Sequence, residues 1–174
     1  MKKIVMIVGI VLVVLAGSLI FKKPTNANED YLRLHIRAHS NSEQDQAVKY
    51  KVKTAIVEFL QDKIEKQTSK QGVEKVLTSE KQNIKAVAED VLSKNGFCYG
   101  ANVEIKNEFF PTRSYEDLVL SEGYYDALIV ELGSAKGDNW WCVVYPPLCF
   151  ASPSGKNVVY KSKIMEIIQN WKNK

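Results

Sequence analysis

The stretch Asn139-Trp140-Trp141-Cys142-Val143-Val144-Tyr145-Pro146-Pro147-Leu148-Cys149-Phe150 holds two of the three tryptophans, two of the three cysteines and two of the five prolines. So dense an aromatic and apolar run requires a core in which it is buried. Residues 140–145 have the character of a strand, which Pro146-Pro147 ends, so Trp140 and Trp141 point to opposite faces of a sheet. One tryptophan therefore belongs to the core, and the other is either covered by a helix or exposed in a contact.

The segments just upstream also predict strands. Residues 124–132 alternate in polarity, and the short connection Gly133–Asp138 predicts that they form an antiparallel hairpin with residues 140–145. Residues 102–106 alternate as well. We expect a loop at Phe109-Phe110-Pro111-Thr112-Arg113, because a proline cannot donate a hydrogen bond to a strand ladder. A turn is expected at Ser121-Glu122-Gly123.

Nearer the N-terminus, residues 31–38 alternate and predict a strand with one buried face. The apolar face carries Leu32, Leu34, Ile36 and Ala38, and the polar face carries Arg33, His35, Arg37 and His39. We expect the polar face to be solvated. The alternative is that it forms a binding surface.

Helices are predicted between these strands and at the C-terminus. The first follows a capping box, either Ser40 with Glu43 or Ser42 with Asp45, and runs to about Lys66. The second runs from about Val73 to Asn95-Gly96, and the third is the amphipathic stretch 164–171. This order predicts an α+β fold: an antiparallel or mixed sheet of four or five strands, with two long N-terminal helices and a C-terminal helix packed on it. The first strand must insert into the sheet to bury its apolar face.

The first 23 residues form a targeting segment. Lys2 and Lys3 precede eighteen uncharged residues, Ile4 to Phe21, and Lys22-Lys23-Pro24 ends the run. This layout fits a cleaved signal peptide, and it is just long enough to serve as an uncleaved membrane anchor. Residues 24–30 are then a polar spacer, and residues 31–174 form a single globular domain.

Composition and motifs exclude several classes of function. The net charge of +4 falls to +2 without the first 21 residues, which is too small to indicate a nucleic-acid partner. We find no motif of a catalytic site and no cofactor site. His35 and His39 would lie about 13 Å apart at ~3.3 Å per residue of strand, too far to share one metal ion. We therefore expect no catalytic residues, no metal and no cofactor.

Cys142 and Cys149 flank Pro146-Pro147, and the chain carries an export segment. In an oxidising compartment the two cysteines would form a disulfide. The alternative is two free buried thiols that act as small hydrophobes, because connectivity does not follow from sequence alone. Cys98 is the odd cysteine, beside Phe97 and Tyr99.

Three motifs resemble one known family in the same order. They are Leu32-Arg-Leu-His-Ile-Arg-Ala-His-Ser-Asn-Ser-Glu-Gln-Asp-Gln46, Phe110-Pro-Thr-Arg-Ser-Tyr115 and Gly137-Asp-Asn-Trp-Trp-Cys-Val-Val-Tyr-Pro-Pro-Leu-Cys-Phe150. Together they resemble the stage II sporulation protein R family over most of residues 31–150. Cys98 does not belong to the family pattern, which supports pairing Cys142 with Cys149.

The resemblance implies a role that the residues alone do not supply. Members of that family look like non-enzymatic signals of spore-forming bacteria, secreted across the forespore membrane into the space between forespore and mother cell. They trigger a membrane-embedded aspartic protease of the mother cell that processes pro-sigma-E. The expected partner is therefore the extracytoplasmic part of that protease, together with the membrane through residues 4–21.

The candidates for partner contact are Asn139, Trp140, Trp141, Pro146, Pro147, Phe110, Pro111 and Arg113, with Arg33, His35 and Arg37 as weaker ones. Two rival functions remain open. One is a secreted or anchored hydrolase that uses Cys or His, which would lose turnover when these residues are replaced. The other is a non-enzymatic cell-wall-binding module, which purified sacculi would capture.

Overall fold

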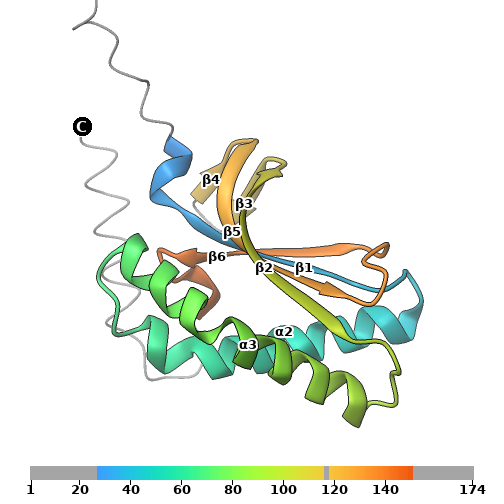
Figure 1. Cartoon of the computed structure of the whole chain (residues 1–174). Coiled ribbons are helices and arrows are strands. Elements are labelled where there is room, and N and C mark those ends of the chain that lie inside the picture. The colour runs from blue at the N-terminus through green and yellow to red at the C-terminus, as the bar shows by residue number, and fades with distance from the viewer. Residues whose placement is uncertain (1–26, 116–117, 151–174) are drawn as a thin grey trace, which may run out of the picture.

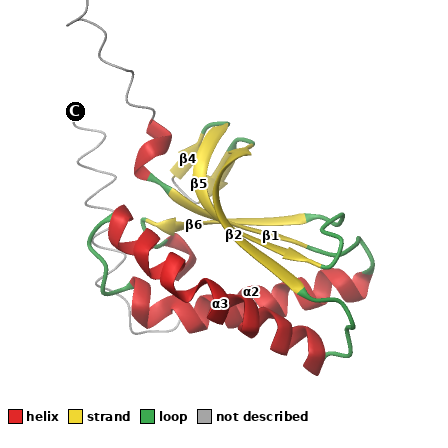
Figure 2. Cartoon of the chain, viewed as in Figure 1, coloured by secondary structure: helices red, strands yellow, loops and turns green. Residues whose placement is uncertain are grey.

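The computed structural model describes residues 27–115 and 118–150. A four-stranded sheet is covered on one face by two long helices (Figures 1 and 2). The elements are the 3₁₀ helix η1 (Ala27–Asp30), β1 (Leu32–Arg37), α2 (Glu43–Ile64), α3 (Lys70–Lys94), β2 (Ala101–Phe110), β3 (Arg113–Tyr115), β4 (Leu118–Leu120), β5 (Gly123–Leu132), β6 (Asn139–Tyr145) and the 3₁₀ helix η2 (Leu148–Phe150). The predicted α+β class is confirmed, whereas the predicted N-terminal segment 1–23 and C-terminal helix lie outside the described residues.

The sheet is mixed, with strand order β2-β5-β1-β6. As predicted, β1 inserts into the sheet: it pairs in parallel with β5 and antiparallel with β6. The predicted hairpin between residues 124–132 and 140–145 is therefore wrong, because β1 lies between the two strands. The strand β1 has apolar residues to bury and needs a neighbour on each side, and this requirement outweighs the short β5–β6 connection.

The β5–β6 connection has to pass the end of β1, and a glycine allows it. The Gly137 amide donates a 2.9 Å hydrogen bond to the Ala38 carbonyl. A Cβ atom at Gly137 would lie 2.2 Å from the Ser40 carbonyl oxygen, a clash with backbone that no side-chain movement relieves.

Each helix contributes one apolar stripe to the core beneath the sheet. In α2 the stripe repeats every fourth residue and comprises Val48, Val52, Ile56, Leu60 and Ile64. In α3 the stripe repeats at intervals of four and seven residues and comprises Val73, Leu77, Ile84, Ala88 and Leu92. Ser42 caps α2 by accepting a hydrogen bond from the Asp45 amide, the second of the two predicted caps. Ser69 caps α3, so that helix begins three residues before the predicted Val73. Gly96, with φ of 80°, follows its C-terminal end as predicted.

The predicted loop at residues 109–113 is also wrong. Phe109 and Phe110 still belong to β2 and pair with Tyr124 and Gly123 of β5. Pro111 does interrupt the ladder, but the chain then forms a second sheet in which β3 pairs with β4. In Figure 1 this small sheet stands on the side of the main sheet that faces away from the helices. It gives the main sheet a second buried face.

Candidate functional site

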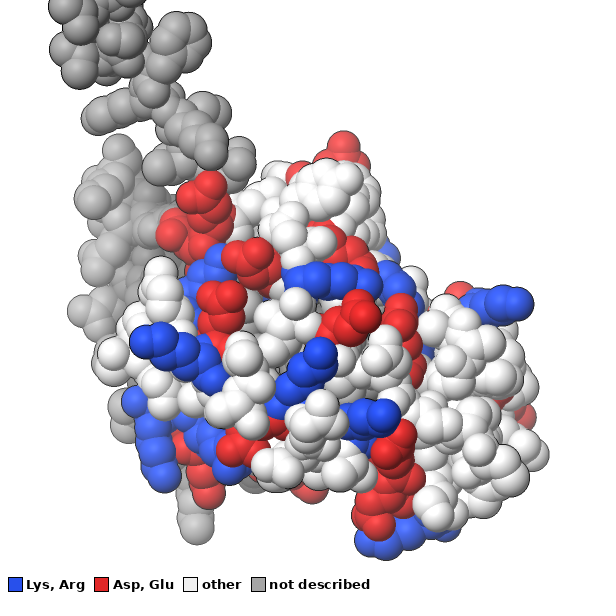
Figure 3. Space-filling view, viewed as in Figure 1, with Lys and Arg blue, Asp and Glu red and all other residues white. Residues whose placement is uncertain are grey.

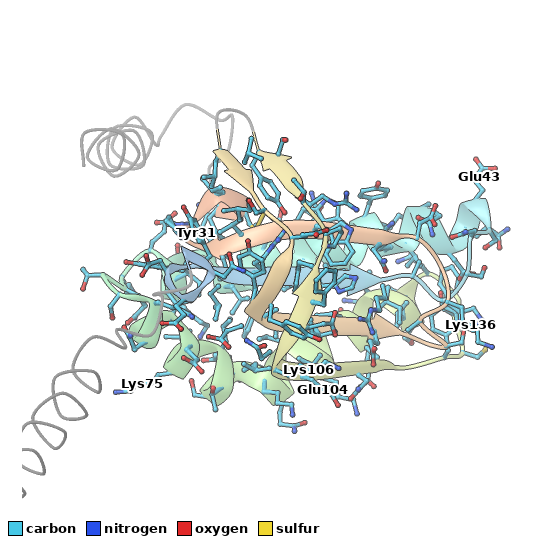
Figure 4. All side chains as sticks on the ribbon, turned by 90° about the horizontal axis from the view of Figure 1, so that it is seen from above. Tyr31, Glu43, Lys75, Glu104, Lys106 and Lys136 are labelled. Atoms are coloured by element: carbon cyan, nitrogen blue, oxygen red, sulfur yellow. A yellow bond between two sulfur atoms is a disulfide. The ribbon has the colours of Figure 1, made fainter. Side chains whose placement is uncertain are left out.

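The face of β1 that points away from the helices is buried, although the sequence predicted a solvated face. Arg33 is 0 % exposed and His35 is 1 % exposed. They lie in a second core with Phe110, Tyr125, Ile129 and Val143, against which Tyr115, Leu118 and Trp141 pack. The prediction fails because β3 and β4 bring aromatic and apolar side chains over this face. Figure 4 looks onto the molecule from this side.

Arg33 sits among aromatic rings. Its guanidinium carbon lies 4.2 Å from the ring centroid of Phe110 and 4.8 Å from that of Tyr125. Its Nη2 donates a 2.7 Å hydrogen bond to the hydroxyl of Tyr115. These contacts hold a positive charge inside the protein by cation–π attraction and a hydrogen bond to a neutral hydroxyl.

His35 joins this aromatic group to a carboxylate. Its ring stacks on Trp141 with centroids 3.7 Å apart, and its Nδ1 lies 2.8 Å from Oε1 of Glu108. Burial lowers the pKa of His35, against the raising effects of Glu108 and Asn139. The imidazole is therefore neutral near pH 7 and donates its Nδ1 proton to Glu108.

Glu108 connects His35 to Arg37. Burial alone would raise the pKa of Glu108, but the hydrogen bond from His35 and the charge of Arg37 outweigh it and lower that pKa. Nη2 of Arg37 donates to Glu108 and Nη1 donates to Glu131, each over 2.6 Å. The carboxylates of Glu108 and Glu131 accept these hydrogen bonds and hold two side chains of β1 in place.

These contacts predict an acid-labile contribution of Glu108 to stability. A carboxyl group whose pKa is lowered by folding stabilises the protein above its unfolded pKa, about 4.3, and loses that contribution as the pH falls through the folded pKa. We expect Glu108→Gln to lower the free energy of unfolding by about 1.5–3 kcal/mol at pH 7, the range for hydrogen bonds to charged groups. The difference from the wild type should shrink below about pH 4 in urea titrations followed by circular dichroism.

Glu104→Gln is the matched control for that experiment. Glu104 lies on the same strand, is more exposed, and pairs with Lys106 at the edge of the sheet (Figure 4). Exposed pairs contribute little, so its replacement should have a much smaller effect at pH 7. Equal effects of the two replacements would contradict a buried role for Glu108.

The cluster reaches solvent at Trp141, Arg113 and Asn139. Trp141 is half-buried, and the exposed Arg113 lies over its ring at 5.4 Å from the centroid. Phe110 meets the same ring edge-on at 4.9 Å. Asn139 begins β6 and is exposed. Because Trp141 is fixed by His35, Phe110 and Arg113, its exposed part is held in one orientation.

The turn after β6 is closed covalently, as one of the two sequence alternatives predicted. A disulfide joins Cys142 to Cys149, with Cα atoms 5.9 Å apart. Phe150, at the end of η2, is buried in the core between the sheet and the helices. Pro146 and Pro147 lie between the two cysteines and are half-buried. Cys98 is free and exposed.

The structure brings together most but not all of the predicted contact residues. Arg33, His35, Arg37, Phe110, Arg113, Asn139 and Trp141 form one cluster on the face away from the helices. Trp140 lies on the opposite face, where Lys53 approaches its ring to 5.6 Å, so the two tryptophans point apart as predicted. Pro111 is half-buried after β2, whereas Pro146 and Pro147 belong to the disulfide turn.

Sequence reasoning missed four members of the cluster: Glu108, Tyr115, Tyr125 and Glu131. Glu108 extends the alternation of residues 102–106 by one step, and this period-two pattern is the signal that would have placed it opposite β1. Nothing local marks Tyr115, because the three-residue strands β3 and β4 are too short to show a period.

Other features of the described residues bear on the remaining predictions. Within residues 27–115 and 118–150, no group of three or more His, Cys, Asp or Glu side chains could hold a metal ion. In the same ranges no helix has the length and hydropathy needed to span a bilayer. On the side that displays α3, basic and acidic side chains are interspersed (Figure 3).

Comparisons with known proteins identify the family. Residues 28–154 match the family described as Stage II sporulation protein R (spore_II_R). The chain is 31% identical over 177 residues to the Stage II sporulation protein R of Bacillus subtilis (strain 168), covering 95% of this chain and 79% of that protein. No solved structure matches the chain significantly. The chain therefore belongs to the stage II sporulation protein R family.

Proposed function

We propose that this protein is a secreted sporulation signal. In this proposal it crosses the forespore membrane into the space between forespore and mother cell, where it triggers the membrane-embedded aspartic protease that processes pro-sigma-E. The observation that carries the proposal is family membership over almost the whole chain. The protein acts as a ligand of the protease and does not itself cleave the precursor.

Two further features support an extracytoplasmic role. The sequence begins with the basic and apolar segment described above, which either is removed on export or anchors the protein. The Cys142–Cys149 disulfide suits an oxidising compartment outside the cytoplasm.

The contact with the protease is proposed to centre on Trp141 and Arg113. A ligand activates a receptor only by binding its active arrangement more tightly than its inactive one, so a stiff contact surface is favourable. Tryptophan and arginine are the residue types most enriched in binding hot spots. Trp141 is held from beneath by His35 and Phe110, which are buried and therefore position the contact without making it.

Reconstitution in a non-sporulating bacterial host tests the proposal. Precursor and protease are co-expressed with or without the full chain, and cleavage of the precursor is followed on immunoblots. We expect cleavage only when all three are present. Omitting the protease controls for cleavage by host enzymes or by the chain itself. Precursor processing that is the same with and without the chain would contradict the proposal.

The same assay tests the contact surface. Arg113→Ala removes an exposed side chain that lies outside the second core and ends its cation–π contact with Trp141, while the fold should be unaffected. We expect it to reduce processing at limiting amounts of the signal, because hot-spot truncations cost about 2 kcal/mol or more of binding free energy. Lys136→Ala is the control, since Lys136 is exposed on the β5–β6 connection, which lies at one end of the molecule in Figure 4. Equal activity of both variants would place the contact elsewhere.

A further inference from the structure

Arg33 carries a buried charge with hydrogen-bonding capacity left over. The side chain is completely buried, and a guanidinium stays protonated in proteins. Its Nη2 donates a hydrogen bond to Tyr115, but neither Nε nor Nη1 has a hydrogen-bond partner among the described residues. No carboxylate among residues 27–115 and 118–150 forms an ion pair with Arg33, although Arg37, four residues along the strand, pairs with two.

The aromatic rings around Arg33 do not replace an anion. The guanidinium carbon lies over the rings of Phe110 and Tyr125, an arrangement that stabilises the charge through their π-electrons. The N–H groups of a guanidinium lie in its plane, where they require oxygen acceptors. A buried cation with unmet donors is costly to retain unless an anion joins it.

The side chain that accepts this hydrogen bond packs at the edge of the second core. Tyr115 accepts that bond, and it is half-buried, so its ring reaches both Arg33 and the surface. A hydrogen-bond acceptor that enters beside Tyr115 would therefore find unpaired N–H donors on Arg33.

We propose that Arg33 binds a carboxylate of an acidic segment of the partner protein, which displaces the Tyr115 hydroxyl. This deepens the proposed function and rests on it, because the acidic segment would belong to the extracytoplasmic part of the protease. A carboxylate matches the planar donors of the guanidinium better than any neutral acceptor. Arg33 then distinguishes the bound from the free state, since its pairing is completed only in the complex.

Arg33→Met tests the proposal in the full chain. Methionine is an unbranched apolar side chain that fills much of the same space and removes the unpaired charge, so the variant should keep the Tm of the wild type or exceed it. Truncating one partner of a buried charge pair costs roughly 30-fold or more in affinity, and precursor processing at limiting signal should fall accordingly. Unchanged stability with lost processing is a result that a purely structural arginine would not give.

A double-mutant cycle identifies the carboxylate. Each Asp and Glu in the extracytoplasmic loops of the protease is replaced singly by its amide and assayed with wild-type signal and with Arg33→Met. We expect one replacement to lower processing by itself and to cause no further loss when combined with Arg33→Met. If the losses of processing multiply in every combination of Arg33→Met with a protease replacement, the proposal is overturned.

Arg37→Met is the matched control. Arg37 lies on the same face of β1 but already pairs with Glu108 and Glu131, so its replacement should lower the Tm. Its effect on processing should be independent of the effect of every protease replacement. If Arg33→Met likewise lowers the Tm in proportion to processing, Arg33 belongs to the fold and the inference fails. If wild-type signal causes no processing, the proposed function itself fails, and the two failures are thereby distinguished.

Discussion

Phe110→Ala is expected to lower the free energy of unfolding by about 3–5 kcal/mol, the range for deleting a buried aromatic side chain. Phe110 is completely buried at the end of β2. Its ring contacts Arg33 by a cation–π interaction and meets His35 and Trp141 edge-on. The loss of stability should exceed that at an ordinary core position, because the substitution also removes a ring that stabilises the buried charge of Arg33. Urea unfolding followed by tryptophan fluorescence measures it.

Phe109→Ala provides an adjacent control with the same change in side-chain volume. Phe109 lies on the opposite face of β2, is 50 % exposed, and touches Tyr124 edge-on. Its loss should cost less than about 1 kcal/mol, the contribution of an exposed aromatic pair. If the two variants were equally destabilised, the face of the sheet away from the helices would not be a second core, and Trp141 would lack its support.

The contrast between these neighbours shows what the sequence could predict. Alternation correctly assigned Arg33, His35 and Arg37 to one face of β1. It could not say what covers that face, because period two reports which side chains share a side and nothing about their partners. The cover comes from β3 and β4, whose strands of three residues are too short for a periodic signal. The burial of Arg33 is therefore a tertiary property.

Pairing was harder to predict than strand location for a similar physical reason. A short connection favours a hairpin, but β1 has residues to bury on both faces and takes the central position between β5 and β6. The connection through Gly137 consequently arches past the end of β1. Likewise, Pro111 interrupts one ladder as expected, yet Phe109 and Phe110 before it still pair with β5. The local sequence patterns located the strands correctly. The burial of residues that are distant in sequence determined which strands pair.

The double variant Cys142→Ala/Cys149→Ala is expected to be less stable than the wild type by roughly 2–3 kcal/mol, the chain-entropy estimate for a loop of this size. Dithiothreitol should lower the stability of the wild type by a similar amount and leave the variant unchanged. Urea unfolding with and without the reductant measures both effects. Cys98→Ala is the control, because Cys98 is exposed and unpaired, and it should be neutral.

Loss of the disulfide should also affect the structure locally, because the bridge ties η2 to β6. Cys142 is buried in β6 beside Trp141, and Cys149 lies in η2 next to the buried Phe150. Opening the bridge releases the segment that carries Phe150 but leaves β6 paired with β1, so the contacts of Trp141 with His35 and Phe110 should persist. Processing by the double variant should then fall only as far as its folded fraction falls. A complete loss of processing in a folded double variant would instead place Pro146 and Pro147 in the contact with the protease.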